Sequence, residues 1–365
     1  MIIKEIKIFK YSIPMHPFTI ATGTMHFAQN ILIKVFTDSP IIGIGECSAF
    51  PMIVGETQKT CYEMAKDFAI LWKGKDALDI EARLNDLNLF TSGNTTIKSA
   101  FDMALYDIAA KNAGQTLYQY LGGDKKEMLT DITVGIGSPS EMAHQAKAFA
   151  DNGASTLKIK LGKDVETDVE RMKEIRAVVG SQIKIRIDAN QGWNFEDAKK
   201  ALVQLGQYDI EFCEQPMNAF DDALLPELMK LSPIKLMADE SVYNHHDALR
   251  LVKNKACHYI NIKFAKSGGI HEALKIIAVA RENNIPCMMG GMLESRVALT
   301  AFAHFAAANP QIIFYDMDTC MLGHKIDPVI GGVTYNGYNV QLPDGIGIGA
   351  DVEEDFLKSC EMVTV

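Results

Sequence analysis

The chain has 365 residues, of which 48% are hydrophobic and 22% charged, a composition that suits a globular protein with a sizeable core. Its formal net charge of −10 disfavours partners such as nucleic acid or an anionic membrane surface, because both require a basic protein surface. Seven scattered cysteines without a CxxC pair predict reduced thiols in a cytoplasmic protein.

The first third of the chain predicts an α+β domain. Alternating apolar and polar residues predict strands at 2–13, 30–37 and 43–47. Helical periodicity predicts helices at 57–72 and 96–120. The N-terminus lacks the unbroken apolar stretch of a signal peptide, and no apolar run approaches the roughly 18 residues of a membrane span.

From about residue 130, short β-rich runs alternate with amphipathic helical stretches. The β-rich runs lie at 131–136, 156–161, 183–188, 210–214, 235–239, 258–263, 285–290 and 312–316. Helical stretches such as 139–151, 164–179 and 268–283 separate them. Eight strands that alternate with helices predict a parallel β/α barrel. The glycine-rich tail breaks this rhythm, and we expect it to return to the N-terminal domain.

Five charged residues each end one of the predicted barrel strands, in the order Lys160, Asp188, Glu214, Asp239 and Lys263. They are spaced 24 to 28 residues apart, which is one strand and one helix. Functional groups of such barrels lie at the C-terminal strand ends, so these five side chains should converge on one mouth.

The three acids of this series, Asp188, Glu214 and Asp239, end neighbouring strands and predict a metal site. Any one of them alone could be a helix N-cap or an ion-pair partner, but three adjacent carboxylates would repel one another without a cation. Ligation by oxygen alone favours Mg²⁺ over zinc.

The two lysines of the series end the second and sixth strands, which lie opposite each other in an eight-stranded barrel. Lys160 and Lys263 should therefore face each other across the mouth as two general bases. A lysine acts as a base only when its pKa falls, and a nearby Mg²⁺, a second ammonium and burial all act in that direction. Lys158, on the same strand face as Lys160, could supply the ammonium, whereas Lys266 could do so or be solvated.

The eighth strand ends in FYDMDTC, where Asp316 and Asp318 are two residues apart. Such a pair could bind an ammonium group of a substrate, or it could form Asx turns in a loop. Glu294, after the seventh strand, could touch the site or serve the first turn of the next helix.

These patterns resemble the enolase superfamily in its muconate-lactonizing subgroup. The matching segments are LKIKLG (157–162), IRIDANQGW (185–193), CEQP (213–216), MADES (237–241) and NIKFAKSGGI (261–270). The resemblance implies an α/β fold, namely a modified (β/α)₇β TIM-like barrel with an α+β N-terminal capping domain. The implied domains are a capping domain at 1–125, a barrel at 126–322 and a C-terminal segment at 323–365 that returns to the capping domain. It also implies one Mg²⁺ and abstraction of a proton α to a carboxylate.

Within this subgroup, the chain resembles the dipeptide epimerases, which invert the α-carbon of the C-terminal residue of a dipeptide. By this resemblance, Asp316 and Asp318 bind the α-ammonium of the dipeptide, and Asn190 supports the metal site. The other positions that the resemblance assigns to substrate binding are Thr133, Lys158, Gly291 and Met292.

One departure concerns the side chain of the second substrate residue. Ala–Glu epimerases carry an arginine in a mobile loop of the capping domain, whereas residues 16–27 of this chain contain no Lys or Arg and have Gly23 near that position. We therefore expect a dipeptide such as Ala-Xaa with a small or hydrophobic neutral Xaa, of the kind that cell-wall murein provides as D-Ala-D/L-Ala. The oligomeric state stays open, a homo-oligomer included.

Other activities share the lysine and metal pattern. Muconate cycloisomerases, o-succinylbenzoate synthases and N-acylamino acid racemases act on substrates without a free α-ammonium, and so do not require the Asp316 and Asp318 pair. A metal-dependent binding protein without catalysis is the remaining alternative. Function follows the site and not the fold, so the aspartate pair favours a dipeptide epimerase.

Overall fold

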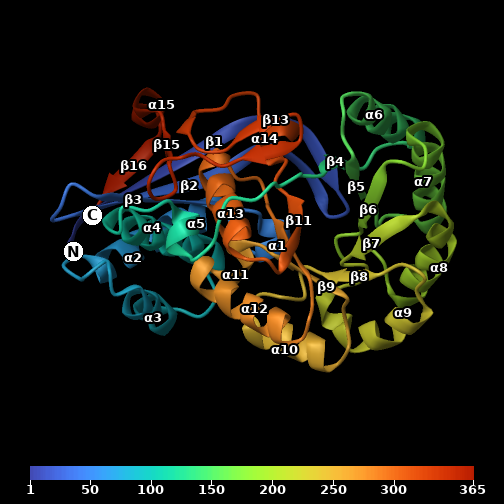
Figure 1. Ribbon diagram of the computed structural model, residues 1–365, viewed down its shortest axis with the longest axis horizontal. Coiled ribbons are helices and arrows are strands. Elements are labelled where there is room, and N and C mark those ends of the chain that lie inside the picture. Colours follow the sequence, from blue (N-terminus) through green and yellow to red (C-terminus); the bar gives the residue numbers. More distant parts are fainter.

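The N-terminal part is an antiparallel sheet with helices on one face, seen at the left of Figure 1 in the computed structural model of residues 1–365. Its strands, in the order β16-β1-β2-β3, are β1 (Ile3–Ile20), β2 (Gly23–Thr37), β3 (Ile42–Ser48) and β16 (Glu361–Thr364). Its helices are α1 (Pro51–Val54), α2 (Gln58–Trp72), α3 (Ile80–Phe90), α4 (Thr95–Asn112) and α5 (Leu117–Tyr120). Every residue of α4 from Thr96 to Ala110 is buried, as a helix between two packed layers requires.

The second part is a parallel eight-stranded sheet with strands in sequential order, and it confirms the predicted barrel. The strands are β4 (Ile132–Val134), β5 (Thr156–Lys160), β6 (Lys184–Asp188), β7 (Ile210–Glu214), β8 (Leu236–Ala238), β9 (Tyr259–Ile262), β10 (Cys287–Gly290) and β11 (Ile312–Asp316). Seven helices connect them, namely α6 (Pro139–Asp151), α7 (Val165–Val179), α8 (Phe195–Leu205), α9 (Leu225–Leu231), α10 (His245–Lys253), α12 (Ile270–Glu282) and α13 (Arg296–Ala308). The short α11 (Phe264–Ser267) and α14 (Thr319–Leu322) follow β9 and β11.

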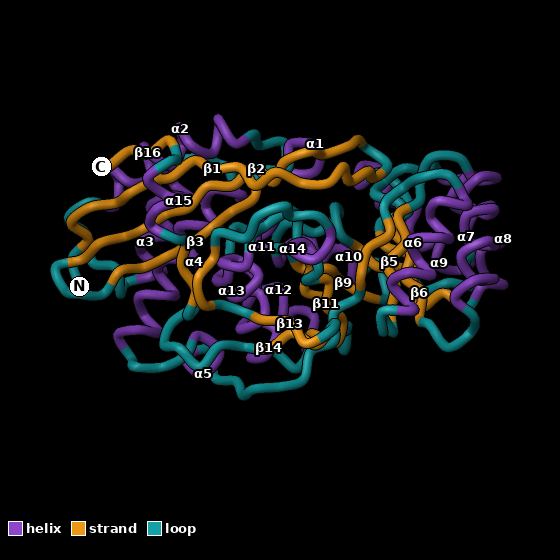
Figure 2. The backbone as a smooth tube through the Cα atoms, turned by 90° about the horizontal axis from the view of Figure 1, so that it is seen from above, coloured by secondary structure: helices purple, strands orange, loops and turns teal.

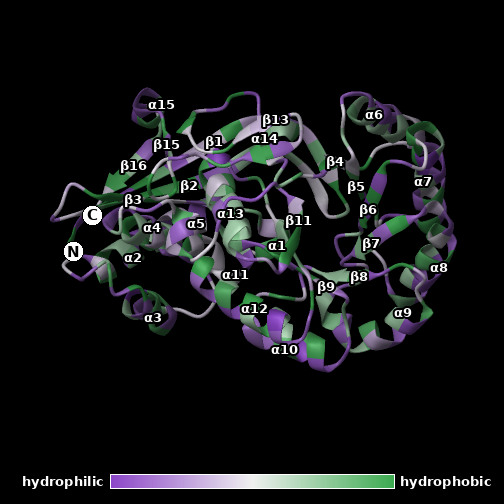
Figure 3. Ribbon diagram, viewed as in Figure 1, coloured by the Kyte–Doolittle hydropathy of each residue, from purple (hydrophilic) through white to green (hydrophobic).

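The outer helices of the barrel are amphipathic. In α8 the buried residues Ala198, Ala201, Leu202 and Leu205 recur at the spacing of one helix face. Figure 3 shows the resulting mixture of hydrophobic and hydrophilic residues along α7, α8 and α9. None of the helices combines the length and apolar character needed to cross a bilayer.

The barrel closes at a seam between β4 and β11, its first and last strands. The two strands form no regular ladder, and individual hydrogen bonds join them instead. The backbone N–H of Asp131 donates to the carbonyl of Tyr315 at 3.1 Å. The backbone N–H of Thr133 donates to the carboxylate of Asp318 at 2.6 Å. A side chain of the predicted site therefore helps to close the barrel.

The C-terminal segment crosses from the barrel back to the capping domain. It contains β12 (Val329–Gly331), β13 (Thr334–Asn336), β14 (Asn339–Gln341), β15 (Ala350–Val352) and α15 (Glu354–Lys358). Its last strand, β16, pairs with β1, so both chain ends lie at the same end of the molecule (Figure 1).

The first two strands are longer than predicted. Residues 16–27, which the sequence suggested to be a mobile loop, form the tip of a β-hairpin in which Phe18 pairs with Met25 and Ile20 with Gly23. The tip reaches the barrel, where Thr19 accepts a hydrogen bond from the backbone of Ile136 at 2.8 Å (Figure 2). The polar residues and prolines near the tip obscured the strand pattern in the sequence.

Three buried acids of the capping domain accept hydrogen bonds from the rest of the chain. Asp102 of α4 accepts from two backbone N–H groups at the start of α12. Asp107 of α4 accepts from the backbone of Ile348 in the C-terminal segment. Glu46 of β3 accepts from the backbone and hydroxyl of Ser295 and from the backbone of Ala298, at the start of α13. These hydrogen bonds join the capping domain to the barrel and to the C-terminal segment.

Replacing Glu46 tests this anchoring. Its carboxylate accepts hydrogen bonds from five donors. Besides the three donors at the start of α13, these are the hydroxyl of Tyr11 at 2.5 Å and the amide of Asn30 at 2.7 Å. Hydrogen bonds to a charged group contribute about 1.5–3 kcal/mol each, so Glu46→Gln should lower the free energy of unfolding by at least about 3 kcal/mol in urea titrations. Tyr11→Phe, which removes one donor, should cost about 1 kcal/mol. Equal losses in the two variants would contradict an anchoring role.

Candidate active site

The five charged residues predicted from the strand spacing gather at the C-terminal mouth of the barrel. Lys160, Asp188 and Glu214 are the last residues of β5, β6 and β7, and each pairs in register with the next. Asp239 and Lys263 directly follow β8 and β9. All five side chains are buried, although the lysines keep a small exposed fraction.

The two predicted bases lie at opposite ends of the carboxylate arc. The ammonium of Lys160 lies 2.6 Å from Asp188 Oδ2, at the β6 end of the arc. The ammonium of Lys263 lies 2.8 Å from Asp239 Oδ2, at the β8 end. The three carboxylates thus lie between two lysines that approach from different sides.

Lys158 connects the carboxylate arc with the aspartates of β11. Its ammonium lies 2.7 Å from Glu214 Oε2, 2.7 Å from Asp316 Oδ2 and 3.4 Å from Asp188 Oδ2. Asp316 is thus linked to the carboxylate arc although several strands separate the two around the barrel. The number of intervening strands gives the distance around the barrel wall, whereas the side chain of Lys158 reaches across the barrel interior.

Lys266 is neither solvated nor a free ammonium. It is 1% exposed, and its ammonium lies 2.6 Å from Asp239 Oδ1. The same group donates to the carbonyls of Val242 and Asn261, both at 3.1 Å. Lys266 therefore fixes the orientation of the Asp239 carboxylate.

The charges of the arc shift the pKa values of its members. Burial opposes the charged form of Lys263, but Asp239 and Glu214 outweigh burial and raise its pKa well above the usual value. Burial and the neighbouring Asp188 raise the pKa of Glu214 to about 7. The protein's own charges thus do not produce the lowered lysine pKa that a base needs. The carboxylates keep the proton on Lys263 unless a cation takes up their charge.

The arc fits a divalent cation. Glu214 Oε2 and both carboxylate oxygens of Asp239 are fully buried and accept no hydrogen bond from a backbone N–H, a hydroxyl or an amide. Their only polar neighbours at short distance are the ammonium groups of lysines. Carboxylate oxygens are the ligands that Mg²⁺ prefers, and the partners of these oxygens are already cations.

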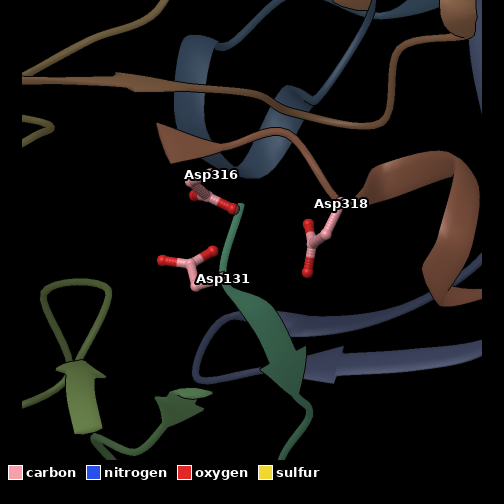
Figure 4. Close-up of side chains that lie close together, drawn as sticks. All are labelled: Asp131, Asp316 and Asp318. Carbon is pink, nitrogen blue, oxygen red and sulfur yellow. The ribbon is translucent and has the colours of Figure 1, made fainter. Parts of the chain in front are cut away.

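The carboxylates that approach one another most closely are those at the barrel seam. Oxygens of Asp131, Asp316 and Asp318 all lie within 4.8 Å of one another, and we call these residues the acid trio. Figure 4 shows the three side chains around a common space, with Asp316 from β11, Asp318 from the start of α14 and Asp131 just before β4. The predicted pair is therefore joined by a third acid.

The three acids of the trio differ in whether a cation lies beside them. Burial opposes the charge of Asp316, but Lys158 and Lys160 outweigh burial and lower its pKa. Burial and the neighbouring Asp316 raise the pKa of Asp131 to about 6, although Arg186 lies 2.8 Å away. Burial and Asp316 raise the pKa of Asp318 well above its usual value. Asp318 is the member without a cation partner, so the trio has capacity for one more positive charge.

The remaining predicted positions lie next to these groups. Thr133 is buried at the seam, with its backbone bonded to Asp318. Gly291 adjoins the trio, since a Cβ added there would lie 3.7 Å from the carbonyl oxygen of Asp316. The backbone N–H of Met292 donates to Glu294 at 2.6 Å, and burial raises the pKa of Glu294 to about 8. The helix α13 is capped by Ser295, so Glu294 is not its N-cap.

Asn190 and Asn261 donate hydrogen bonds to carboxylates of the arc, and of these two the sequence did not predict Asn261. The backbone of Asn190 donates to Asp188 Oδ1 at 2.9 Å, and its amide donates to Glu240 Oε1 at 3.2 Å. Asn261 donates to Glu214 Oε1 at 2.6 Å. Strand alternation could have revealed Asn261, which lies two residues before the lysine at the end of β9. A lone acid before a strand, such as Asp131, gives no signal of this kind.

Comparison with protein families matches nearly the whole chain. Residues 3–122 match the mandelate racemase/muconate lactonizing enzyme N-terminal domain, and residues 141–356 match the enolase C-terminal domain-like family. The chain belongs to the enolase superfamily.

Relatives within this superfamily cover the chain almost completely. The D-Ala-D/L-Ala epimerase of Cytophaga hutchinsonii is 39% identical over 100% of both chains. The L-Ala-D/L-Glu epimerase of Clostridium acetobutylicum is 38% identical over 96% of this chain and 99% of the relative. The crystal structure of the dipeptide epimerase from Cytophaga hutchinsonii with Mg and D-Ala-L-Val matches with a TM-score of 0.99, at 40% identity and full coverage of both chains.

The fit of the carboxylate arc to a cation predicts that Mg²⁺ stabilises the fold. Saturating Mg²⁺ should raise the Tm of the enzyme, because binding to the folded state alone contributes about 2.7 kcal/mol at 100 times Kd. Glu214→Gln should weaken Mg²⁺ binding at least about tenfold in calorimetric titrations. Glu282→Gln, at an exposed position, is the matched control and should leave binding unchanged. Unaltered Mg²⁺ affinity in Glu214→Gln would show that the arc is not the metal site.

Proposed function

We propose that the protein is a dipeptide epimerase that inverts the α-carbon of the C-terminal residue of its substrate by a two-base proton transfer. The observation that carries this proposal is the placement of Lys160 and Lys263 at opposite ends of one buried carboxylate arc. Two lysines on opposite sides of a reacting carbon suit inversion, whereas an elimination needs one base. The sequence similarity to enzymes named epimerases of dipeptides supports this proposal.

In the proposed mechanism, the two lysines exchange roles. One lysine, as the neutral amine, accepts the α-proton from one face of the substrate. The opposite lysine, as the ammonium, donates a proton to the other face, so the configuration inverts and both lysines change protonation state. Asp188, Glu214 and Asp239 would hold Mg²⁺, which supplies positive charge where negative charge develops on the substrate carboxylate.

The acid trio would bind the other end of the dipeptide. Asp318 has no cation partner and Asp316 keeps a small exposed side-chain fraction, so both suit the α-ammonium. Binding both ends of the substrate places its α-carbon between the two lysines. A substrate that is held in this orientation has a lower barrier to reaction.

The hairpin tip supports a neutral side chain at the second position. Residues 16–27 contain no Lys or Arg, and a Cβ at Gly23 would lie 2.7 Å from the sulfur of Met52. A thioether beside this position suits a small or hydrophobic residue better than a glutamate. We therefore favour Ala-Xaa dipeptides such as murein-derived D-Ala-D/L-Ala, which resembles the D-Ala-L-Val bound in the Cytophaga hutchinsonii structure. The seven unpaired cysteines support a cytoplasmic location.

The lysines can be tested separately by proton exchange in D₂O. Lys160→Ala and Lys263→Ala should each slow epimerisation about 100- to 10,000-fold. Each variant should still exchange the α-proton of one stereoisomer, because one base remains, and the two variants should prefer opposite stereoisomers in NMR assays. Lys163→Ala, at an exposed position, serves as the control. Normal epimerisation in either active-site variant would refute the two-base scheme.

The aspartate pair separates an epimerase from a lyase on the same scaffold. Asp316→Asn and Asp318→Asn should each raise KM for a free dipeptide at least about tenfold, since a charge-assisted hydrogen bond to the ammonium is lost. The control is Asp344→Asn, which alters an exposed aspartate. A muconate cycloisomerase or o-succinylbenzoate synthase would tolerate the two active-site changes, and unchanged kinetics would favour that class.

A further inference from the structure

Asp131 is a fully buried acid that neither the metal site nor the lysine pair accounts for. Its side chain is 0% exposed, and its Oδ2 accepts a hydrogen bond from Arg186 Nη1 at 2.8 Å. Its Oδ1 is buried and accepts no hydrogen bond. Leaving a carboxylate oxygen in this state costs free energy, so its retention in the barrel calls for a physical reason.

The position of Asp131 is fixed from several directions. Its backbone N–H is bonded to the carbonyl of Tyr315, the residue before Asp316. Arg186, its ion-pair partner, also binds Glu211 at 2.8 Å and packs against the rings of Phe212 and Phe314. The carboxylate of Asp131 therefore stays within 4.8 Å of the other two members of the acid trio.

The charges around the trio do not balance. Three carboxylates face two cations, Arg186 beside Asp131 and Lys158 beside Asp316. Lys158 is also shared with Glu214 and Asp188. Asp318 is the member of the trio without a cation partner, and a monovalent cation can provide one.

We propose that Asp131 is a positioning residue that makes the acid trio selective for a free, positively charged α-ammonium. This inference rests on the proposed function and adds a third acid to the predicted pair. Asp131 does not touch the substrate, because it has no exposed surface. It acts beside Asp316 and Asp318, where its own carboxylate adds to the negative charge of the trio. Neutral N-acylated or amine-free analogues do not supply the missing charge.

The test compares Asp131→Asn with Glu211→Gln. Both changes remove one carboxylate from Arg186, but only the first changes the charge of the acid trio. Two quantities are measured for each variant: KM for an Ala-Xaa dipeptide, and the inhibition constant of the propionyl-Xaa analogue, which lacks the amine. Asp131→Asn should raise KM about tenfold with kcat nearly unchanged and should leave the inhibition constant of the analogue unchanged, whereas Glu211→Gln should change neither.

A substitution that removes a positive charge from beside the trio provides a second measurement. Arg186→Gln removes the cation from Asp131, so the preference for the dipeptide over its amine-free analogue should increase. This ratio does not depend on the amount of folded enzyme, so partial misfolding of a variant does not imitate the effect.

Several results would overturn the inference. One is an equal loss of affinity for the dipeptide and the analogue in Asp131→Asn, and another is the same KM in Asp131→Asn as in the wild type. Binding of two Mg²⁺ ions to the wild type in a titration with the metal alone would assign the trio to a divalent ion instead. Absence of α-proton exchange by the wild-type enzyme with every dipeptide would instead refute the proposed function itself.

Discussion

Buried negative charge inside the barrel is the constraint on which the rest of the structure depends. Eight buried acids line or adjoin the barrel interior: Asp131, Asp188, Glu214, Asp239, Glu240, Glu294, Asp316 and Asp318. Five buried cations accompany them: Lys158, Lys160, Lys263, Lys266 and Arg186. Burying unpaired charge is costly, so the excess is met by proton binding, as the pKa values of about 8 for Glu240 and Glu294 indicate, or by cations from outside. A divalent metal and a substrate ammonium are cations of that kind.

This charge also links the two ends of the site. The ammonium of Lys158 contacts both the carboxylate arc and Asp316, so neither end can change its charge without affecting the other. The carboxylates raise the pKa of Lys263, so this lysine loses its proton only when their charge is taken up. The excess negative charge that attracts a cation therefore also determines when the lysines can act as bases.

The sequence predicted the barrel and the mouth of the site because both depend on regular spacing. Strand runs about 25 residues apart fixed which residues end neighbouring strands, and strand alternation placed Lys158 with Lys160. The acid trio was only partly predictable. Asp131 meets Asp316 through the closure of the barrel, where single hydrogen bonds replace a ladder and no periodicity marks the contact. The hairpin tip was missed for a similar reason, since its strands are held by pairing across the turn and not by an apolar pattern of their own.

The seam between β4 and β11 has a consequence for how such an enzyme can diverge. The carboxylate of Asp318 accepts the backbone N–H of Thr133, so a residue of the candidate site also joins the first and last strands of the barrel. A mutation of Asp318 is expected both to alter the recognition of the substrate and to weaken the closure of the barrel. The hairpin tip takes no part in this seam and meets the barrel through contacts such as the backbone hydrogen bond from Ile136 to Thr19. Substitutions in the hairpin tip can therefore leave the barrel closed, whereas substitutions at Asp318 affect the stability of the fold.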